Sequence, residues 1–265
     1  MECSDRNTRG SLELATCVAI DIYKMVSFRY LIPNVLTSFA LCCGVTAIYF
    51  SMKGDFESAI WCIVLAAMLD LVDGRVARWL HAASHFGAEL DSLADFANFG
   101  VAPVFIIYSW SLHEFDGLGW VAVLVFVISS ALRIARHNIV FGDITKPGRS
   151  HHFFTGVPTP AGAIVVLLPA YLSLLGLIDI SHGWSAIVFV HIVFVSILMV
   201  SRLPTFTGKQ IAFRSRVGVA IPLVAAILAL IMISSLPWLC LSALSIVYLG
   251  SLPFSFRAYR RRLDT

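Results

Sequence analysis

The sequence predicts an all-α, polytopic membrane protein with about eight transmembrane helices. Of its 265 residues, 58% are hydrophobic and 13% are charged, and the mean hydropathy is +0.85; soluble domains carry roughly 25% charged residues. Too few charges remain to cover a water-facing surface, which excludes a soluble enzyme, a disordered chain and a nucleic-acid-binding protein. Long apolar runs without polar–apolar alternation favour helices over a transmembrane barrel.

Eight runs qualify as spans, because each is long and apolar enough to cross the hydrocarbon core and is bounded by polar or turn-forming residues. In chain order they cover residues 31–51, 58–80, 86–112, 118–140, 160–178, 184–200, 217–235 and 238–256. The chain is therefore expected to divide into a juxtamembrane segment at 1–29, a core at 30–209, two further helices at 210–256 and a basic tail at 257–265. The six cysteines show no C-x-x-C spacing, so neither a disulfide framework nor a zinc site is indicated.

Lysine and arginine fall almost entirely on one side of these spans. Eighteen of the 19 lie in or beside the N-terminal segment, the even-numbered connections and the C-terminal tail, and only Lys53 lies on the opposite side. Cytoplasmic loops carry an excess of Lys and Arg, so we expect both termini in the cytoplasm.

Two pairs of aspartates stand inside the second and third spans, where a charge costs about 2.5–3.5 kcal/mol. Asp70 and Asp73 are three residues apart. Asp91 and Asp95 are four apart, so each pair shares one helix face. The short connection between the two spans makes them antiparallel and places the pairs at matching depth. Converging carboxylates repel one another unless divalent cations neutralise them, and oxygen-only ligands suit Mg²⁺ or Mn²⁺.

Residues beside the acids fit a phosphate-containing ligand. Gly74 and Gly87 lack a Cβ, so a pyrophosphate can approach the backbone closely. Arg78 can present its planar guanidinium to phosphate oxygens. Asn34 and Thr37, at the start of the first span, can hydrogen-bond a nucleotide edge, although the pattern alone favours a helix cap for Asn34.

The acids and glycines together form the pattern D-x-x-D-G-x-x-A-R-x8-G-x3-D-x3-D, in which the chain resembles the CDP-alcohol phosphatidyltransferase family. The eight fixed positions are Asp70, Asp73, Gly74, Ala77, Arg78, Gly87, Asp91 and Asp95. The resemblance implies a six-helix core with a cytoplasm-facing cavity, and homodimers. It also implies two divalent ions held by the four aspartates, with Asp95 as the catalytic base. For the CDP-linked lipid we expect binding by Asn34, Thr37, Asp70, Gly74, Ala77, Arg78 and Gly87.

Further segments resemble the bacterial phosphatidylserine synthase branch of that family. They are Leu31–Thr37, Asp91–Pro103, Ala131–Asn138, Phe154–Ala161 and Met199–Pro204. This branch implies CDP-diacylglycerol and L-serine as substrates, phosphatidylserine and CMP as products, and an inner-membrane enzyme whose active site faces the cytoplasm. Arg133 and Arg136 share a helix face and Arg149 lies in the loop that follows, so they can bind the serine carboxylate. Asn138, from the same segment as the first two, completes the expected serine site.

Three alternatives stay open at this stage. The same fold can serve another acceptor, such as glycerol phosphate, an inositol phosphate or choline, and the sequence departs from the branch at Asn98 and His137. Asp95 can serve as a fourth metal ligand and not as the base. The acids can also form a proton relay or buried ion pairs in a transporter, although we find no internal repeat of the kind that transporters show.

Overall fold

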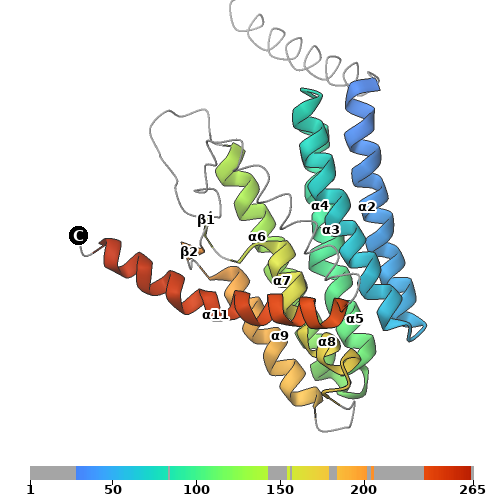
Figure 1. The fold of residues 1–265 in the computed structure, drawn as a ribbon, viewed down its shortest axis with the longest axis vertical. Coiled ribbons are helices and arrows are strands. Elements are labelled where there is room, and N and C mark those ends of the chain that lie inside the picture. The colour runs from blue at the N-terminus through green and yellow to red at the C-terminus, as the bar shows by residue number, and fades with distance from the viewer. Residues whose placement is uncertain are drawn as a thin grey trace, which may run out of the picture.

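A computed structural model of the chain describes residues 28–82, 84–142, 154–155, 157–178, 184–201, 204–205 and 236–263. These residues form a helical bundle (Figure 1). Its helices are α2 (Phe28–Met52), α3 (Phe56–Trp79), α4 (His85–Asp95), the π-helix η1 (Phe96–Val101), α5 (Ala102–Trp110), the 3₁₀-helix η2 (Leu112–Glu114), α6 (Asp116–Gly142), α7 (Thr159–Val166), α8 (Leu168–Leu174), α9 (Ser185–Val200) and α11 (Pro237–Leu263). The helical fold class is confirmed for the described residues. One feature was not predicted, a two-residue antiparallel pairing of β1 (Phe154–Thr155) with β2 (Pro204–Thr205).

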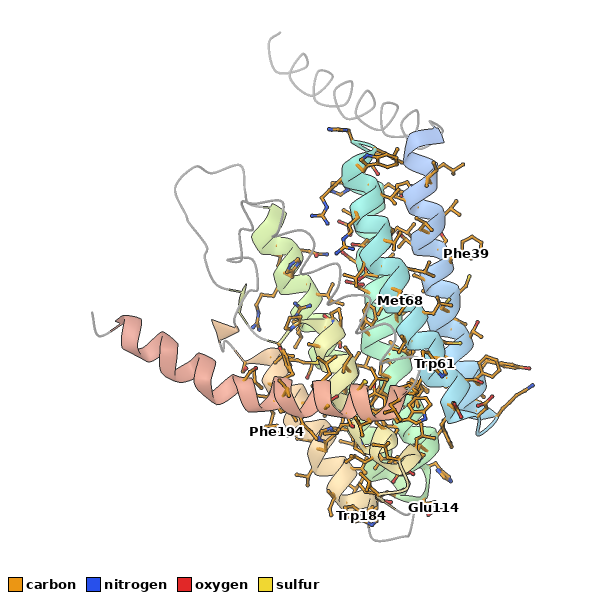
Figure 2. All side chains as sticks on the ribbon, in the orientation of Figure 1. Phe39, Trp61, Met68, Glu114, Trp184 and Phe194 are labelled. Carbon is orange, nitrogen blue, oxygen red and sulfur yellow. The ribbon has the colours of Figure 1, made fainter. Side chains whose placement is uncertain are left out.

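Three helical stretches among the described residues are long and apolar enough to cross a membrane. They are Leu31–Met52, His85–Trp110 and Gly117–Ile139. Shorter apolar helices cover Ser185–Val200 and Pro237–Leu252. Large apolar side chains lie on the outer faces, with Phe39 exposed at 59% and Phe194 at 49% (Figure 2), as suits contact with lipid tails.

The count of eight spans stays a prediction. The expected second span coincides with α3, whose C-terminal half carries the charged residues of the motif. The expected seventh span, 217–235, lies outside the described residues. The expected eighth span falls in α11, which crosses the bundle instead of running alongside α2 (Figure 1).

The core lies where α3, α5, α6, α8 and α9 meet. Its largest fully buried side chains include Phe126, Tyr171, Ile60, Ile107 and Ile192. Figure 1 shows the start of α2, the α3–α4 turn and the end of α6 at the same end of the bundle. The motif residues therefore lie between the centre of the bundle and that end.

A glycine allows α2 to approach η1 closely. A Cβ on Gly44 would overlap the amide oxygen of Asn98 and lie 2.9 Å from its Cγ and 3.1 Å from its Cα. Asn98 itself is 1% exposed. The lack of a side chain at Gly44 thus allows the two helices to pack closely within the chain.

The expected fifth span is interrupted, because α7 ends at Val166 and α8 begins at Leu168. Pro169 has no N–H to donate to the carbonyl four residues earlier, that of Val165. His191 of α9 takes that place, with Nε2 donating to the Val165 carbonyl at 2.9 Å. Backbone carbonyls need partners in hydrocarbon, so this contact stabilises the break.

Helix α11 packs against the bundle, and two of its contacts are specific side-chain contacts. Trp238, near its start, packs against Trp61 of α3 with ring centroids 6.1 Å apart. Further along, the Ser245 hydroxyl donates to the Ile164 carbonyl in the last turn of α7 at 3.1 Å. The second contact uses another carbonyl beside the α7–α8 break.

We expect Gly44→Ala to destabilise the folded protein by about 1–3 kcal/mol, because the added methyl group forces α2 away from Asn98. Thermal unfolding in detergent measures this as a lower Tm. Gly250→Ala is the matched control, since a Cβ there meets nothing within 4 Å.

Adding Asn98→Ser to Gly44→Ala should restore part of the lost Tm, because the shorter side chain frees space for the methyl group. Equal Tm values for the single and double variants would show that the Gly44–Asn98 contact does not limit helix packing.

Candidate active site

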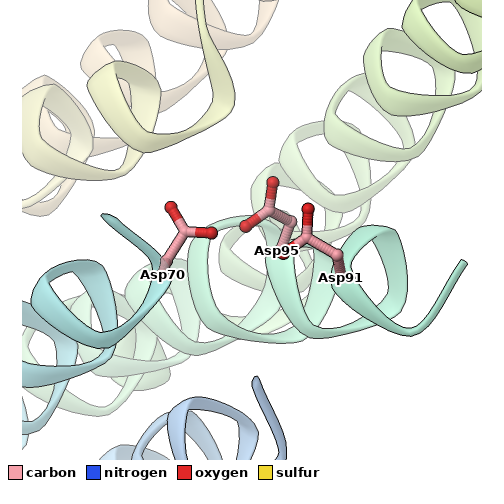
Figure 3. A group of neighbouring side chains, drawn as sticks. All are labelled: Asp70, Asp91 and Asp95. Carbon is pink, nitrogen blue, oxygen red and sulfur yellow. The ribbon is translucent and has the colours of Figure 1, made fainter. Parts of the chain in front are cut away.

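Three of the four predicted acids converge between α3 and α4 (Figure 3). Asp70 comes from α3, and Asp91 and Asp95 come from α4. One carboxylate oxygen of each lies within 4.8 Å of the others, and the carboxyl groups of Asp70 and Asp95 are in hydrogen-bond contact. All three side chains are half-buried. The matched depth expected from the antiparallel spans is therefore present in the structure.

The turn between α3 and α4 explains this convergence. α3 ends at Trp79 and is followed, after the cap residue Leu80, by His81 in the left-handed region (φ 51°), and the Ala82 N–H donates to the Ala77 carbonyl at 2.9 Å. Left-handed residues commonly end helices in this way. α4 then begins at a cap, where the Ser84 hydroxyl accepts from the Gly87 N–H at 3.0 Å. The chain thus reverses within a few residues and brings the two acid-bearing faces together.

Asp73 lies apart from the other three acids. It is 4% exposed, and its Oδ2 accepts a hydrogen bond of 2.7 Å from the Thr37 hydroxyl of α2. The contact joins two residues for which the sequence predicted different partners, a metal and a nucleotide.

A cavity of about 160 Å³ opens beside the acids. Its lining contains most of the residues predicted for the CDP-linked lipid and two of the acids: Asn34, Thr37, Asp73, Gly74, Ala77, Gly87 and Asp91. Pro33, Ala82, Ser84 and Ala88 complete the lining. Two predicted lipid-binding residues are not in the lining. Asp70 belongs to the acid cluster, and Arg78 is exposed with its Nε donating to the Gly74 carbonyl at 2.9 Å.

The two motif glycines differ in their surroundings. A Cβ on Gly74 would meet nothing within 4 Å, so this position leaves free space at the cavity wall. A Cβ on Gly87 would lie 3.0 Å from Asn34 Oδ1 and 3.0 Å from Ser84 Oγ. Gly87 is therefore explained by the packing of α4 on α2, whereas Gly74 is free to face a ligand.

Arg133 of α6 links the acid cluster to two other helices. Its guanidinium donates to the Thr159 hydroxyl of α7 and interacts electrostatically with Asp95 and with Tyr248 of α11. Asp91 belongs to both the cavity wall and the acid cluster. The cluster therefore adjoins the cavity through Asp91 and Arg133 through Asp95.

The other residues predicted for the serine site have structural partners or lie outside the described residues. Arg136 donates to the Val200 carbonyl at the end of α9 at 3.0 Å. Asn138 donates to the Ser92 hydroxyl of α4 at 3.0 Å, which ties α6 to the acid-bearing helix. Arg149 lies outside the described residues.

The chemistry of the donor set fits a divalent cation. The three acids offer only carboxylate oxygens, the ligands that Mg²⁺ and Mn²⁺ prefer. Among the described side chains, no Lys or Arg forms an ion pair with any of them. Arg133 interacts electrostatically with Asp95, but the two side chains do not form an ion pair.

Sequence reasoning missed three residues of this region. Ser84 caps α4, and the signal was a serine three residues before a motif glycine. Thr159 lies in the segment Phe154–Ala161, at a position that the family pattern leaves open. Tyr248 lies far along the chain, and no local pattern connects it with Arg133.

Comparisons with known proteins agree with this arrangement. The sequence model described as CDP-alcohol phosphatidyltransferase matches residues 30–198. A protein of Mycobacterium bovis named CDP-diacylglycerol–serine O-phosphatidyltransferase is 37% identical over 237 residues, covering 87% of this chain and 79% of the relative. Proteins of the same name from Helicobacter pylori (40% over 139 residues; 52% of this chain, 56% of the relative) and Bacillus subtilis (36% over 138 residues; 52% and 74%) are also similar. The chain belongs to the CDP-alcohol phosphatidyltransferase family.

Proposed function

We propose that this protein is a CDP-diacylglycerol–serine O-phosphatidyltransferase, which transfers the phosphatidyl group of CDP-diacylglycerol to the hydroxyl of L-serine and releases CMP. The similarity to the Mycobacterium bovis protein of that name extends over 87% of the chain. The structural observation that carries the proposal is that the acid cluster adjoins both a cavity lined by motif residues, through Asp91, and Arg133, through Asp95. The cavity is the proposed site of the donor lipid, and the region around Arg133 is the proposed site of the acceptor.

The cation site consists of Asp70, Asp91 and Asp95, with Asp73 one helical turn from Asp70. We propose that these residues hold two Mg²⁺ or Mn²⁺ ions. When bound, the ions polarise the phosphoryl oxygens and stabilise the charge of the departing CMP.

On the donor side, the cavity holds the CDP part of the lipid. Gly74 leaves room for the pyrophosphate at the cavity wall. Ala77, three residues later on the same helix face, adds only a methyl group to that wall. Asn34 remains available to the nucleotide, whereas the Thr37 hydroxyl is engaged with Asp73 and acts by fixing that carboxylate. Arg78 is exposed next to the cavity, where its guanidinium can contact phosphate oxygens.

On the acceptor side, Asp95 accepts the proton of the serine hydroxyl. The serine oxygen forms a bond to the phosphorus that carries diacylglycerol, and the bond from that phosphorus to the bridging oxygen of CMP breaks. Arg133 binds the serine carboxylate, with its guanidinium oriented by Thr159. Arg136 and Asn138 position α6 through their contacts with α9 and α4, and Arg149 is proposed as a further carboxylate ligand.

We also propose an inner-membrane location with the active site and both termini facing the cytoplasm, and a homodimeric state. Four described basic residues, Arg75, Arg78, Arg133 and Arg136, belong to the halves of α3 and α6 at the end of the bundle that carries the α3–α4 turn (Figure 1). Lys53 lies in the turn at the opposite end of α2. This asymmetry supports the orientation through the excess of basic residues in cytoplasmic loops.

The test of the proposed function is CMP release by purified protein given CDP-diacylglycerol and one alcohol at a time. We expect release with L-serine, its loss in EDTA and its recovery with Mg²⁺ or Mn²⁺. Release with glycerol phosphate, an inositol phosphate or choline instead would reassign the acceptor. No release with any alcohol and any divalent ion would contradict the enzyme class and favour a transporter.

The variants Asp91→Asn and Asp95→Asn should have different effects, because Asp91 is proposed as a metal ligand and Asp95 as the catalytic base. Asp91→Asn should raise the metal concentration needed for half-maximal activity, because a ligand is lost. Asp95→Asn should retain CDP-diacylglycerol binding and lose turnover by a factor on the order of 10² to 10⁴, since the amide cannot accept the proton.

Glu89→Gln is the matched control for both variants, because Glu89 is an exposed acid on the same helix. It should leave turnover and metal dependence unchanged. If Asp95→Asn lost metal or lipid affinity in step with turnover, Asp95 would be a ligand only.

Gly74→Ala should raise the KM for CDP-diacylglycerol at least tenfold without lowering the Tm, because its methyl group enters space that only a ligand fills and alanine favours the helix. Gly117→Ala places the same methyl group in open space far from the site and should alter neither quantity. An unchanged KM for Gly74→Ala would show that the lipid does not approach this wall.

A further inference from the structure

The hydroxyl of Tyr248 in α11 is buried and has no hydrogen-bond partner among the described residues. A buried tyrosine hydroxyl usually has a partner, because burying it without one costs free energy. The phenol ring packs against the core, so the unpaired oxygen is not explained by a side chain turned towards solvent. The missing partner suggests a ligand.

The position of Tyr248 is set by the contact that attaches α11 to α7. Ser245, which donates to the Ile164 carbonyl, is three residues before Tyr248 and therefore on the same helix face. This face is directed at the bundle. The attachment of α11 beside the α7–α8 break thus also fixes the place of the phenol.

The Tyr248 hydroxyl interacts with a charged residue of the proposed acceptor site, Arg133. Tyr248 interacts electrostatically with Arg133 but forms no hydrogen bond with it. Arg133 interacts in turn with Asp95. Asp95, Arg133 and Tyr248 therefore mark a path from the acid cluster to α11.

We propose that the Tyr248 hydroxyl donates a hydrogen bond to the carboxylate of the amino-acid acceptor and, with Arg133, selects an acceptor that carries this group. The inference rests on the proposed function. An acceptor whose hydroxyl faces Asp95 extends its remaining groups towards Arg133. Beside a guanidinium, an anion is favoured over the acceptor's ammonium group, and a carboxylate accepts a hydrogen bond from the phenol hydroxyl.

The proposal places an acceptor-selecting residue outside the part of the chain that the family model matches, residues 30–198. The acid motif in that part carries out the shared chemistry. A helix that follows it then contributes to the choice of alcohol.

The test compares L-serine with L-serinamide, in which a neutral amide replaces the carboxylate. Tyr248→Phe removes only the hydroxyl. It should raise the serine KM about tenfold, in line with the loss of a hydrogen bond to a charged group, and leave the KM for CDP-diacylglycerol unchanged. The preference for serine over serinamide, as a ratio of kcat/KM, should fall by a similar factor.

Tyr108→Phe is the matched control, because Tyr108 packs edge-on against Trp120 on α5 and α6, away from the acids. It should change neither the KM values nor the preference. The ratio is measured on one preparation, so it does not depend on the fraction of folded protein.

An unchanged preference in Tyr248→Phe would overturn the inference, and so would an equal fall in activity with both acceptors, which indicates a structural role. Absence of serine-dependent CMP release by the unsubstituted protein would overturn the proposed function itself and the inference with it.

Discussion

The structure depends on bringing three carboxylates within 4.8 Å of one another in a helical bundle of low polarity. Carboxylates at that distance repel one another strongly where water is scarce, so a neighbouring cation and rigid helices must hold them in place. The left-handed end of α3, the Ser84 cap of α4 and the Thr37–Asp73 hydrogen bond provide that rigidity. Each of these acts on the helices that carry the acids.

The same shortage of water explains how the second half of the bundle is connected. A helix interrupted in hydrocarbon leaves carbonyls that only protein groups can satisfy. At the α7–α8 break, His191 and Ser245 donate to the carbonyls of Val165 and Ile164. A local defect caused by Pro169 thereby fixes α9 and α11 against α7. Thr159, the first residue of α7, belongs to this fixed group of helices, and its hydroxyl orients Arg133 by accepting a hydrogen bond from it.

Sequence reasoning identified the acid pairs and their antiparallel arrangement, because these follow from helical spacing and a short turn. Residues assigned to the CDP-linked lipid with the help of the family resemblance make up much of the cavity lining. Sequence reasoning did not anticipate the hydrogen bond from Thr37 to Asp73, because Thr37 lies on another helix. It expected an uninterrupted span at 160–178, since hydropathy does not register the donor that Pro169 lacks. Tyr248 was missed because its relation to Arg133 depends on how α11 crosses the bundle.

The π-helix η1 links these features, because it begins directly after Asp95. The Ala102 N–H donates to the carbonyl of Ala97, five residues earlier, so η1 contains one residue more than a regular helix of the same length. An additional residue rotates the following helix face by about 100°. Pro103 lies just beyond and has no N–H to donate to the carbonyl four residues earlier, that of Phe99, so a change of hydrogen-bond register is tolerated there. The face of α4 that presents the acids is therefore out of phase with the buried face of α5. This rotation allows one membrane-length helix to bury apolar side chains in its second half while directing Asp91 and Asp95 towards α3 in its first.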